Sequence, residues 1–185
     1  MPSKKELIEV ASRAKRRDPG AFATLFDLFF EKMRRYMYFH TGDLDAAEEL
    51  AAEVFTTCLE SIDRFDDRGG TIGPWLYGIA RNLLAEHRRR DGRVTKVPIE
   101  TVTLAATSGN PEGAVLAGLT HQDLYSALSG LPREQREIVI LRFIEGYRVK
   151  EAAGIMGKTP GAVRALQHRA VVSLRKAFKV EEPER

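Results

Sequence analysis

The fold is decided by residues 147–179, which read YRVKEAAGIMGKTPGAVRALQHRAVVSLRKAFK. The spacing of apolar residues predicts a short helix over 149–156 and a longer one from Pro160 to about residue 179, with a break at 157–159. Thr159 can cap the second helix, and Pro160 suits its first turn because no backbone N–H is needed there. Two helices joined by a tight turn with a glycine form either a helix-turn-helix or a plain helical hairpin.

The second of these helices is predicted to be apolar on one side and basic elsewhere. Its buried stripe is expected to comprise Val163, Leu166, Ala170, Leu174 and Phe178. Its other faces carry Arg164, Ala165, His168, Arg169 and Val172. Residues 152–180 contain no Asp or Glu, against Lys158, Arg164, Arg169, Arg175, Lys176 and Lys179. A helix-turn-helix needs such a helix to enter a DNA major groove, whereas a hairpin would simply expose its basic face to water.

The net charge of +3 hides an uneven distribution along the 185 residues, of which 43% are hydrophobic. The segment 43–67 holds the acids Asp43, Asp45, Glu48, Glu49, Glu53, Glu60, Asp63, Asp66 and Asp67, with Arg64 as its one base. The segment 81–96 holds the bases Arg81, Arg88, Arg89, Arg90, Arg93 and Lys96 against Glu86 and Asp91. This pattern suggests two kinds of partner, a basic protein surface and a polyanion.

Several classes of protein do not fit the sequence. Cys58 is the only cysteine, so no intramolecular disulfide is possible, and its apolar neighbours predict a small buried side chain. No signal peptide or membrane-spanning run is present, which favours a cytoplasmic protein. The four histidines are scattered, and no phosphate loop, metal-spaced cluster or activated nucleophile occurs, so we expect no cofactor, no metal site and no enzyme.

The N-terminal half is predicted to contain helices over 3–17, 21–40, 45–65 and 75–90. Ser3 and Glu6 have the spacing of a capping box, and residues 18–20 are expected to form a turn. The second helix is expected to bury a wide face made of Phe22, Leu25, Phe26, Phe29, Phe30, Met33, Tyr36 and Met37, because aromatic residues this dense are more often core than a ligand box.

The third helix is predicted to divide into an apolar and an acidic side. Its inward residues are expected to be Leu50, Val54, Cys58, Leu59 and Ile62. Glu48, Glu49 and Glu53 lie close together at helical spacing. These carboxylates are either a solvated face or a contact for a basic partner.

The fourth helix combines aromatic and basic residues after a glycine-rich loop at 66–74. Bases stack on rings and phosphates meet cations, so this combination suits single-stranded nucleic acid. Tyr77 could serve in stacking or in the core, whereas Trp75 is expected in the core. Residues 91–111 read as a linker, and two more helices are predicted over 112–129 and 132–144. No strand-like alternation persists, so the predicted fold is all-α.

The order of these segments resembles that of the extracytoplasmic-function (ECF) group of RNA polymerase sigma factors in the sigma-70 family. The resemblance runs from about residue 18 to 176 and rests on five segments: DPGAFATLF at 18–26, AEELAAEVF at 47–55, PWLYGIARN at 74–82, LPREQR with LRF and EG over 131–146, and GAVR with HRA over 161–170. It implies sigma region 2 over 1–92, a linker over 93–112 and sigma region 4 over 113–185. No further domain is expected after region 4.

The resemblance also implies roles in region 2. Glu48, Glu49, Leu50 and Glu53, with Phe55 beneath them, would face the clamp helices of the polymerase β′ subunit. The minus-ten element would be bound by Phe65, Tyr77, Arg81, Asn82, Arg88 and Arg89, together with the loop 67–73 and Arg90. Phe65, the loop and Asn82 would surround a flipped base, and the arginines would hold phosphates. Ala46 stands where relatives often carry Asp, which could weaken the polymerase contact slightly.

In region 4 the resemblance implies contacts with the minus-thirty-five element. The matching positions are Thr159, Gly161, Arg164, Ala165, His168, Arg169 and Arg175. Arg169 is the candidate for reading guanine through O6 and N7, and Arg164 and Arg175 are candidates for phosphate contacts. Ala165 and His168 depart from the larger polar residues common in relatives, which bears on the promoter sequence.

The implied partners are core RNA polymerase, through the β′ clamp helices and the β flap, promoter DNA and an anti-sigma factor. The alternative function is a helix-turn-helix regulator that binds duplex DNA without polymerase. Such a regulator would need neither the acidic helix nor the 74–82 segment.

Overall fold

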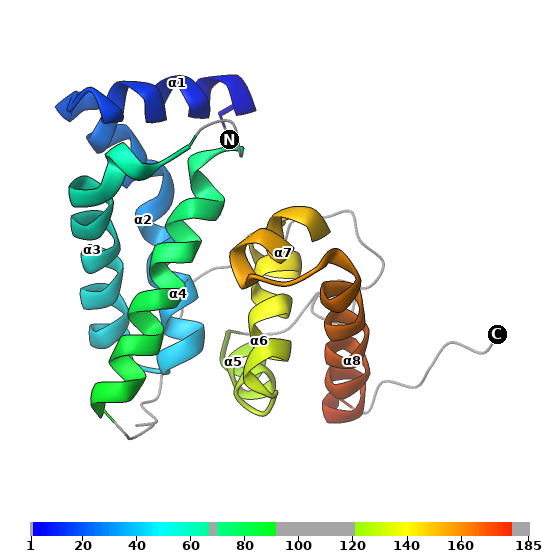
Figure 1. Cartoon of the computed structure of the whole chain (residues 1–185). Coiled ribbons are helices and arrows are strands. Elements are labelled where there is room, and N and C mark those ends of the chain that lie inside the picture. The colour runs from blue at the N-terminus through cyan, green and yellow to red at the C-terminus, as the bar shows by residue number, and fades with distance from the viewer. Residues whose placement is uncertain (1, 67–69, 92–120, 179–185) are drawn as a thin grey trace. The chain divides into compact units, whose positions relative to one another are not determined.

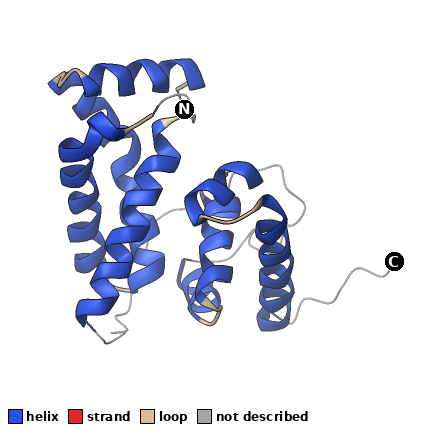
Figure 2. Cartoon of the chain, in the orientation of Figure 1, coloured by secondary structure: helices blue, strands red, loops and turns tan. Residues whose placement is uncertain are grey.

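The computed structural model describes residues 2–66, 70–91 and 121–178, and these are helices joined by short loops, with no strand among them (Figure 2). The chain separates into two compact units, Met1–Lys96 and Val97–Arg185 (Figure 1). The prediction of an all-α fold with two helical domains is therefore confirmed. The expected linker 93–112 and the first part of the helix expected over 112–129 lie outside the described residues.

The first unit begins with α1, Lys4–Lys15, whose start is fixed by the predicted capping box. The backbone N–H of Glu6 donates to Ser3 Oγ at 3.3 Å, and the backbone N–H of Ser3 donates to Glu6 Oε2 at 2.5 Å. These hydrogen bonds lower the pKa of Glu6 because they favour its ionised form. The capping box is confirmed.

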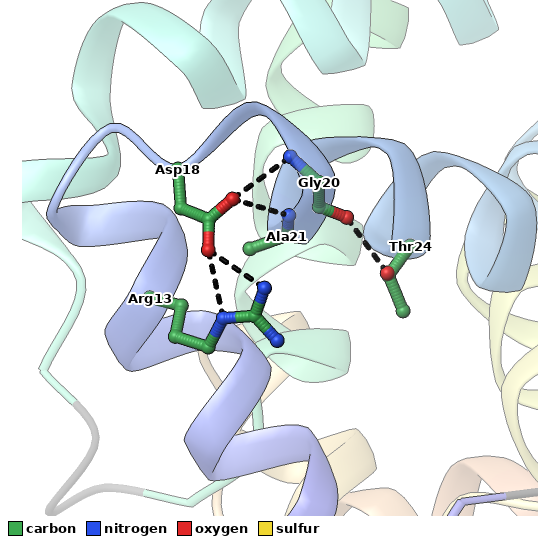
Figure 3. A network of polar contacts seen from close by, with 5 residues as sticks. All are labelled: Arg13, Asp18, Gly20, Ala21 and Thr24. Carbon is green, nitrogen blue, oxygen red and sulfur yellow. Dashed lines mark hydrogen bonds and ion pairs between the residues drawn. The ribbon is translucent and has the colours of Figure 1, made fainter.

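The corner between α1 and α2 is a helix cap rather than the turn expected at 18–20. Helix α2 runs Pro19–Thr41 and begins immediately after its cap, Asp18. Asp18 Oδ1 accepts from the N–H groups of Gly20 at 2.9 Å and Ala21 at 3.3 Å, while Oδ2 pairs with Arg13 at 2.7 Å (Figure 3). The pairing with Arg13 holds the pKa of Asp18 below its usual value. Pro19 and Gly20 thus belong to the first turn of α2.

Three further elements complete the first unit. Helix α2 ends at Gly42, whose φ of 75° is the left-handed conformation that glycine adopts without strain. Helix α3 runs Leu44–Ser61 and continues into a 3-10 turn, η1, Ile62–Arg64. Helix α4, Ile72–Asp91, begins three residues earlier than predicted.

The core of the first unit lies where α2 packs against α3 and α4, with α1 across one end (Figure 1). Its fully buried side chains include Leu25, Met33, Tyr36, Met37, Val54, Cys58, Ile62, Leu76, Tyr77 and Leu84. Burial raises the pKa of the Cys58 thiol to about 11, in agreement with the predicted apolar role. Four residues expected in the core are not fully buried. Phe26 is 41% exposed and Leu59 is 47% exposed, whereas Phe22 and Phe30 are half-buried.

The second unit contains α5 (His121–Ser129), α6 (Arg133–Val139), a π-helical segment η4 (Ile140–Ile144), α7 (Val149–Met156) and α8 (Pro160–Phe178). Arg136 closes the end of α5 by donating to the carbonyls of Leu128 at 2.9 Å and Ser129 at 2.8 Å. Its burial lowers the pKa of the guanidinium. Helix α8 packs on α6, α7 and α5, so it is the element that the other helices of this unit support.

The helix-turn-helix prediction is confirmed in its local details. Gly157 ends α7 with a φ of 63°, and Thr159 Oγ1 accepts from the N–H of Ala162 at 3.2 Å. The predicted stripe residues Val163, Leu166, Ala170 and Leu174 are buried. The side chain of Phe178 lies outside the described part of the chain.

Candidate protein and nucleic-acid interfaces

The acidic side of α3 is exposed along two turns. Glu48, Glu49 and Glu53 all have exposed side chains, as their spacing predicts. Leu50 does not share this surface, because it is only 4% exposed and lies in the core. It can therefore support the acidic face but not touch a partner in this conformation.

On α2, Glu31 pairs with Arg34 at 2.8 Å and raises the pKa of Arg34, with a smaller contribution from Glu48.

An apolar groove lies between α2 and α3, beside the acidic side. It has a volume of about 660 Å³ and is lined by Arg17, Pro19, Phe22, Ala23, Phe26, Ala52, Phe55, Thr56 and Leu59. The ring of Phe26 lies 4.5 Å from that of Phe30 and 4.9 Å from that of Phe55, so three aromatic side chains form one cluster here. The exposure of Phe26 and Leu59 is thus a feature of this groove.

The groove and the acidic side form a continuous surface on α3. Glu49, Ala52 and Thr56 follow one another at spacings of three and four residues, which places them on one helical face. A surface that joins exposed apolar side chains to carboxylates is suited to a protein partner with apolar and basic groups. The sequence reasoning missed the groove, although one signal was present. Phe55 follows Val54 and Leu59 follows Cys58. Phe55 and Leu59 therefore form a second apolar arc, rotated about 100° around the helix from the buried arc.

Two aromatic residues assigned to the minus-ten site are in the core. Phe65 is 4% exposed and its ring lies 5.5 Å from that of Trp75. Tyr77 is fully buried and packs edge-on against Tyr36 at 5.0 Å. Neither ring can stack on a base in this conformation, so burial favours the core alternative for Tyr77. Trp75, expected in the core, is half-buried.

The polar residues assigned to the same site are more accessible. Asn82 and Arg89 are exposed, whereas Arg81 and Arg88 are half-buried. Arg89 lies 3.9 Å from Glu86, a long pairing between exposed side chains that costs little to break. Residues 67–69 of the expected loop lie outside the described residues, and Gly73 belongs to α4.

The start of α8 presents its assigned residues together. Gly161, Arg164, Ala165, His168 and Arg169 are all exposed over the first three turns, and Thr159 precedes them at the cap. Arg175, further along, is half-buried. Positions 161, 164, 165 and 168 follow the spacing of a single helical face. This face carries cations and small side chains without a carboxylate, which suits the floor of a major groove.

Side chains from neighbouring elements hold α8 in place. Arg142 donates from Nε to Gln167 Oε1 at 3.0 Å and from a terminal guanidinium nitrogen to the carbonyl of Tyr147. Ser173 donates to Gln135 Oε1 at 3.1 Å on α6. Lys158, in the turn before α8, pairs with Glu134 at 2.7 Å, so this cation has a structural partner. These contacts hold the exposed face of the first turns of α8 on a rigid support, as precise contacts require. This face comprises Gly161, Arg164, Ala165, His168 and Arg169 and is called the recognition face below.

Other kinds of site find no support in the described ranges. Residues 2–66, 70–91 and 121–178 contain no group of His, Cys, Asp and Glu side chains that could hold a metal ion. Across these same ranges, no helix is both long and apolar enough to cross a membrane.

Two family profiles match the chain. The one described as "Sigma-70 region 2" matches residues 25–94, and the one described as "Sigma-70, region 4" matches residues 121–174. The first therefore covers most of α2, α3 and α4, and the second covers the helix-turn-helix with the helices that support it.

Named relatives extend these matches. The chain is 36% identical over 169 residues to the ECF RNA polymerase sigma factor BldN of Streptomyces coelicolor, covering 91% of this chain but 64% of that protein. It is 31% identical over 171 residues to the ECF RNA polymerase sigma factor SigD of Mycobacterium tuberculosis, covering 90% of this chain and 81% of that protein. Among solved structures, the sigma factor RpoE of Bartonella quintana in complex with the anti-sigma factor NepR matches with a TM-score of 0.68 and 25% identity. That match covers 87% of this chain and 98% of RpoE.

Proposed function

The chain belongs to the sigma-70 family, in its ECF group, and we propose that it binds core RNA polymerase and directs it to initiate at promoters. The observation that carries the proposal is the pairing of two unlike surfaces in one chain. An acidic and apolar surface lies on the first unit, and an acid-free basic recognition face lies on the second. A subunit that links a protein machine to DNA needs both.

The surface on α3 would bind the clamp helices of the polymerase β′ subunit. The carboxylates of Glu48, Glu49 and Glu53 would steer a basic partner and set its register, because exposed charges contribute mainly to encounter rate and specificity. The groove around Phe26 and Leu59 would supply apolar surface, and burying that surface would contribute the binding free energy that exposed charges do not provide. Glu48, Glu49 and Glu53 therefore define only part of the contact surface.

The recognition face of α8 would enter the major groove at the minus-thirty-five element. Arg169 is exposed there and would pair with guanine O6 and N7, while Arg164 and Arg175 would hold phosphates. Ala165 leaves room at the centre of the face for a close approach, and His168 offers a ring nitrogen to a base edge. Thr159 and Gly161 would place the start of the helix against the DNA backbone. The same unit would contact the β flap.

The melted minus-ten element would lie along α4. Asn82 would offer its amide to an unpaired base, and Arg81, Arg88 and Arg89 would bind phosphates of the single strand. We assign Phe65 and Tyr77 a supporting role, since both are buried and hold the segments that carry these polar residues. We further propose that the chain acts in the cytoplasm and is held inactive by an anti-sigma factor, as the RpoE–NepR complex suggests.

A run-off transcription assay tests the proposal. Purified chain and core RNA polymerase are incubated with a pool of genomic promoter fragments, and transcripts are sequenced. Discrete start sites that depend on the chain are expected. Binding to duplex DNA without polymerase, and no transcript with it, would favour the helix-turn-helix regulator instead.

A further inference from the structure

A buried histidine contacts one of the arginines of α4. His40 lies in the last turn of α2 and is only 8% exposed. Its Nδ1 lies 3.2 Å from a terminal guanidinium nitrogen of Arg88, forty-eight residues along the chain. The contact therefore joins the C-terminal end of α2 to the basic end of α4.

The chemistry of the two groups fixes the direction of this hydrogen bond. A guanidinium carries only N–H donors and remains protonated, so Nδ1 of His40 must accept. The imidazole is then neutral, with its proton on Nε2. The ring is also fixed by its edge contact with Tyr36 at 4.7 Å, and Tyr36 contacts Tyr77 in the same way. Edge-on contacts among buried rings therefore hold the acceptor in place.

The end of α2 favours a cation at this place. Unpaired carbonyl groups give the last turn of a helix a partial negative charge, and His40 lies one turn or less from the end of α2. Arg88 is half-buried here, whereas Arg89 and Arg90 beside it are exposed. Within the described residues, Arg88 is the one of these three arginines whose guanidinium is hydrogen-bonded to a ring nitrogen on another helix.

We propose that His40 is a positioning residue for Arg88. A guanidinium has five N–H groups, and the contact with His40 uses one of them. The positioned guanidinium would face a phosphate of the melted promoter strand. A side chain that is ordered before binding loses less conformational freedom when it captures the phosphate. The inference rests on the proposed function of the chain, because it assigns His40 a part in the phosphate contact that Arg88 would make there.

The test measures the affinity of holoenzyme, reconstituted from the chain and core polymerase, for a promoter fragment recovered by run-off transcription. His40→Leu fills the space of the ring without an acceptor, and roughly a threefold to tenfold loss of affinity is expected from one side chain that must now be ordered on binding. His40→Asn places an amide oxygen near the position of Nδ1 and should restore most of the loss. In an Arg88→Ala background, His40→Leu should have no further effect.

Other outcomes overturn the inference. Equal losses for His40→Leu and His40→Asn, or the same loss with and without Arg88, would mean that His40 acts only through the core. Core-polymerase binding and the unfolding midpoint identify a variant that does not fold, in which case His40→Ala replaces His40→Leu in the same cycle. If Arg88→Ala binds like the parent while run-off proceeds, the inference fails and the sigma function stands. If the parent directs no run-off, the proposed function itself fails.

Discussion

The exposed faces of α3 and α8 differ in chemistry, and the difference suits two unlike kinds of partner. Both are long helices whose opposite sides are buried, but α3 exposes carboxylates beside an apolar groove, whereas the early turns of α8 expose cations and bury every large apolar side chain. A protein partner can cover apolar surface, and the groove of α3 offers it. Duplex DNA presents phosphates and base edges, so a recognition helix gains from charge and polar groups instead.

The largest effect on stability is expected from substituting Tyr77. This substitution tests whether the ring supports the core of the first unit or contacts DNA. Tyr77→Ala should lower the free energy of unfolding by about 3–5 kcal/mol, because it removes a fully buried ring. Urea denaturation followed by circular dichroism measures the change. Unaltered stability combined with lost promoter opening would restore the stacking role for this ring.

A charged side chain in the groove should weaken the binding of core polymerase. Leu59→Glu is expected to weaken core-polymerase binding by about 2–3 kcal/mol, because it removes apolar burial at the interface. Stability should change little, since Leu59 is 47% exposed. Leu44→Glu is the matched control, because Leu44 is 36% exposed on the same helix and does not line the groove. Equal binding by the two variants, measured by fluorescence anisotropy, would exclude the groove from the interface.

On the DNA side, Arg169→Ala should cost about 1–3 kcal/mol at a cognate promoter and relax one base position. Arg169 is exposed, so the fold should be unaffected. Promoter selection with the variant holoenzyme reports both affinity and sequence preference. Unchanged transcription from the parent promoter would refute the assignment.

The smallest effect is expected from reversing charge on α3. Glu49→Lys with Glu53→Lys should weaken core-polymerase binding by about 1 kcal/mol or less, and high salt should remove most of the difference. Pull-down of core polymerase at two salt concentrations measures this. Equal capture by the double variant and the parent at low salt would show that these carboxylates are only a solvated face.

Local signals in the sequence predicted the helices well. Ser3 with Glu6, Gly157 and Thr159 mark the ends of helices through hydrogen bonds within a few residues, and each acts as expected. The start of α2 was predicted two residues late, because Asp18 and Pro19 read as a turn although they form a cap and a first helical turn.

Burial was harder to predict because it depends on which other helix covers a side chain. Phe26 and Phe29 both belong to the apolar side of α2, yet Phe29 is 5% exposed and Phe26 is 41% exposed. The groove beside Phe26 exists because α3 turns its second apolar arc toward the solvent there. The family resemblance implied contact roles for Leu50 and Tyr77, whereas helical periodicity placed Leu50 on the inward side and left Tyr77 open between stacking and the core. Both lie in the core. The contact of His40 with Arg88 joins distant segments and has no local signal.

Site-specific photocrosslinking tests most directly whether the groove on α3 binds core polymerase while the recognition face of α8 binds DNA. A photoreactive amino acid is placed at Thr56, which lines the groove, or at Ala165, at the centre of the recognition face, and each holoenzyme is irradiated on promoter DNA. The account predicts that the probe at Thr56 captures a core-polymerase subunit and the probe at Ala165 captures DNA near the minus-thirty-five position. Capture of DNA from Thr56, or of polymerase alone from Ala165, would contradict it.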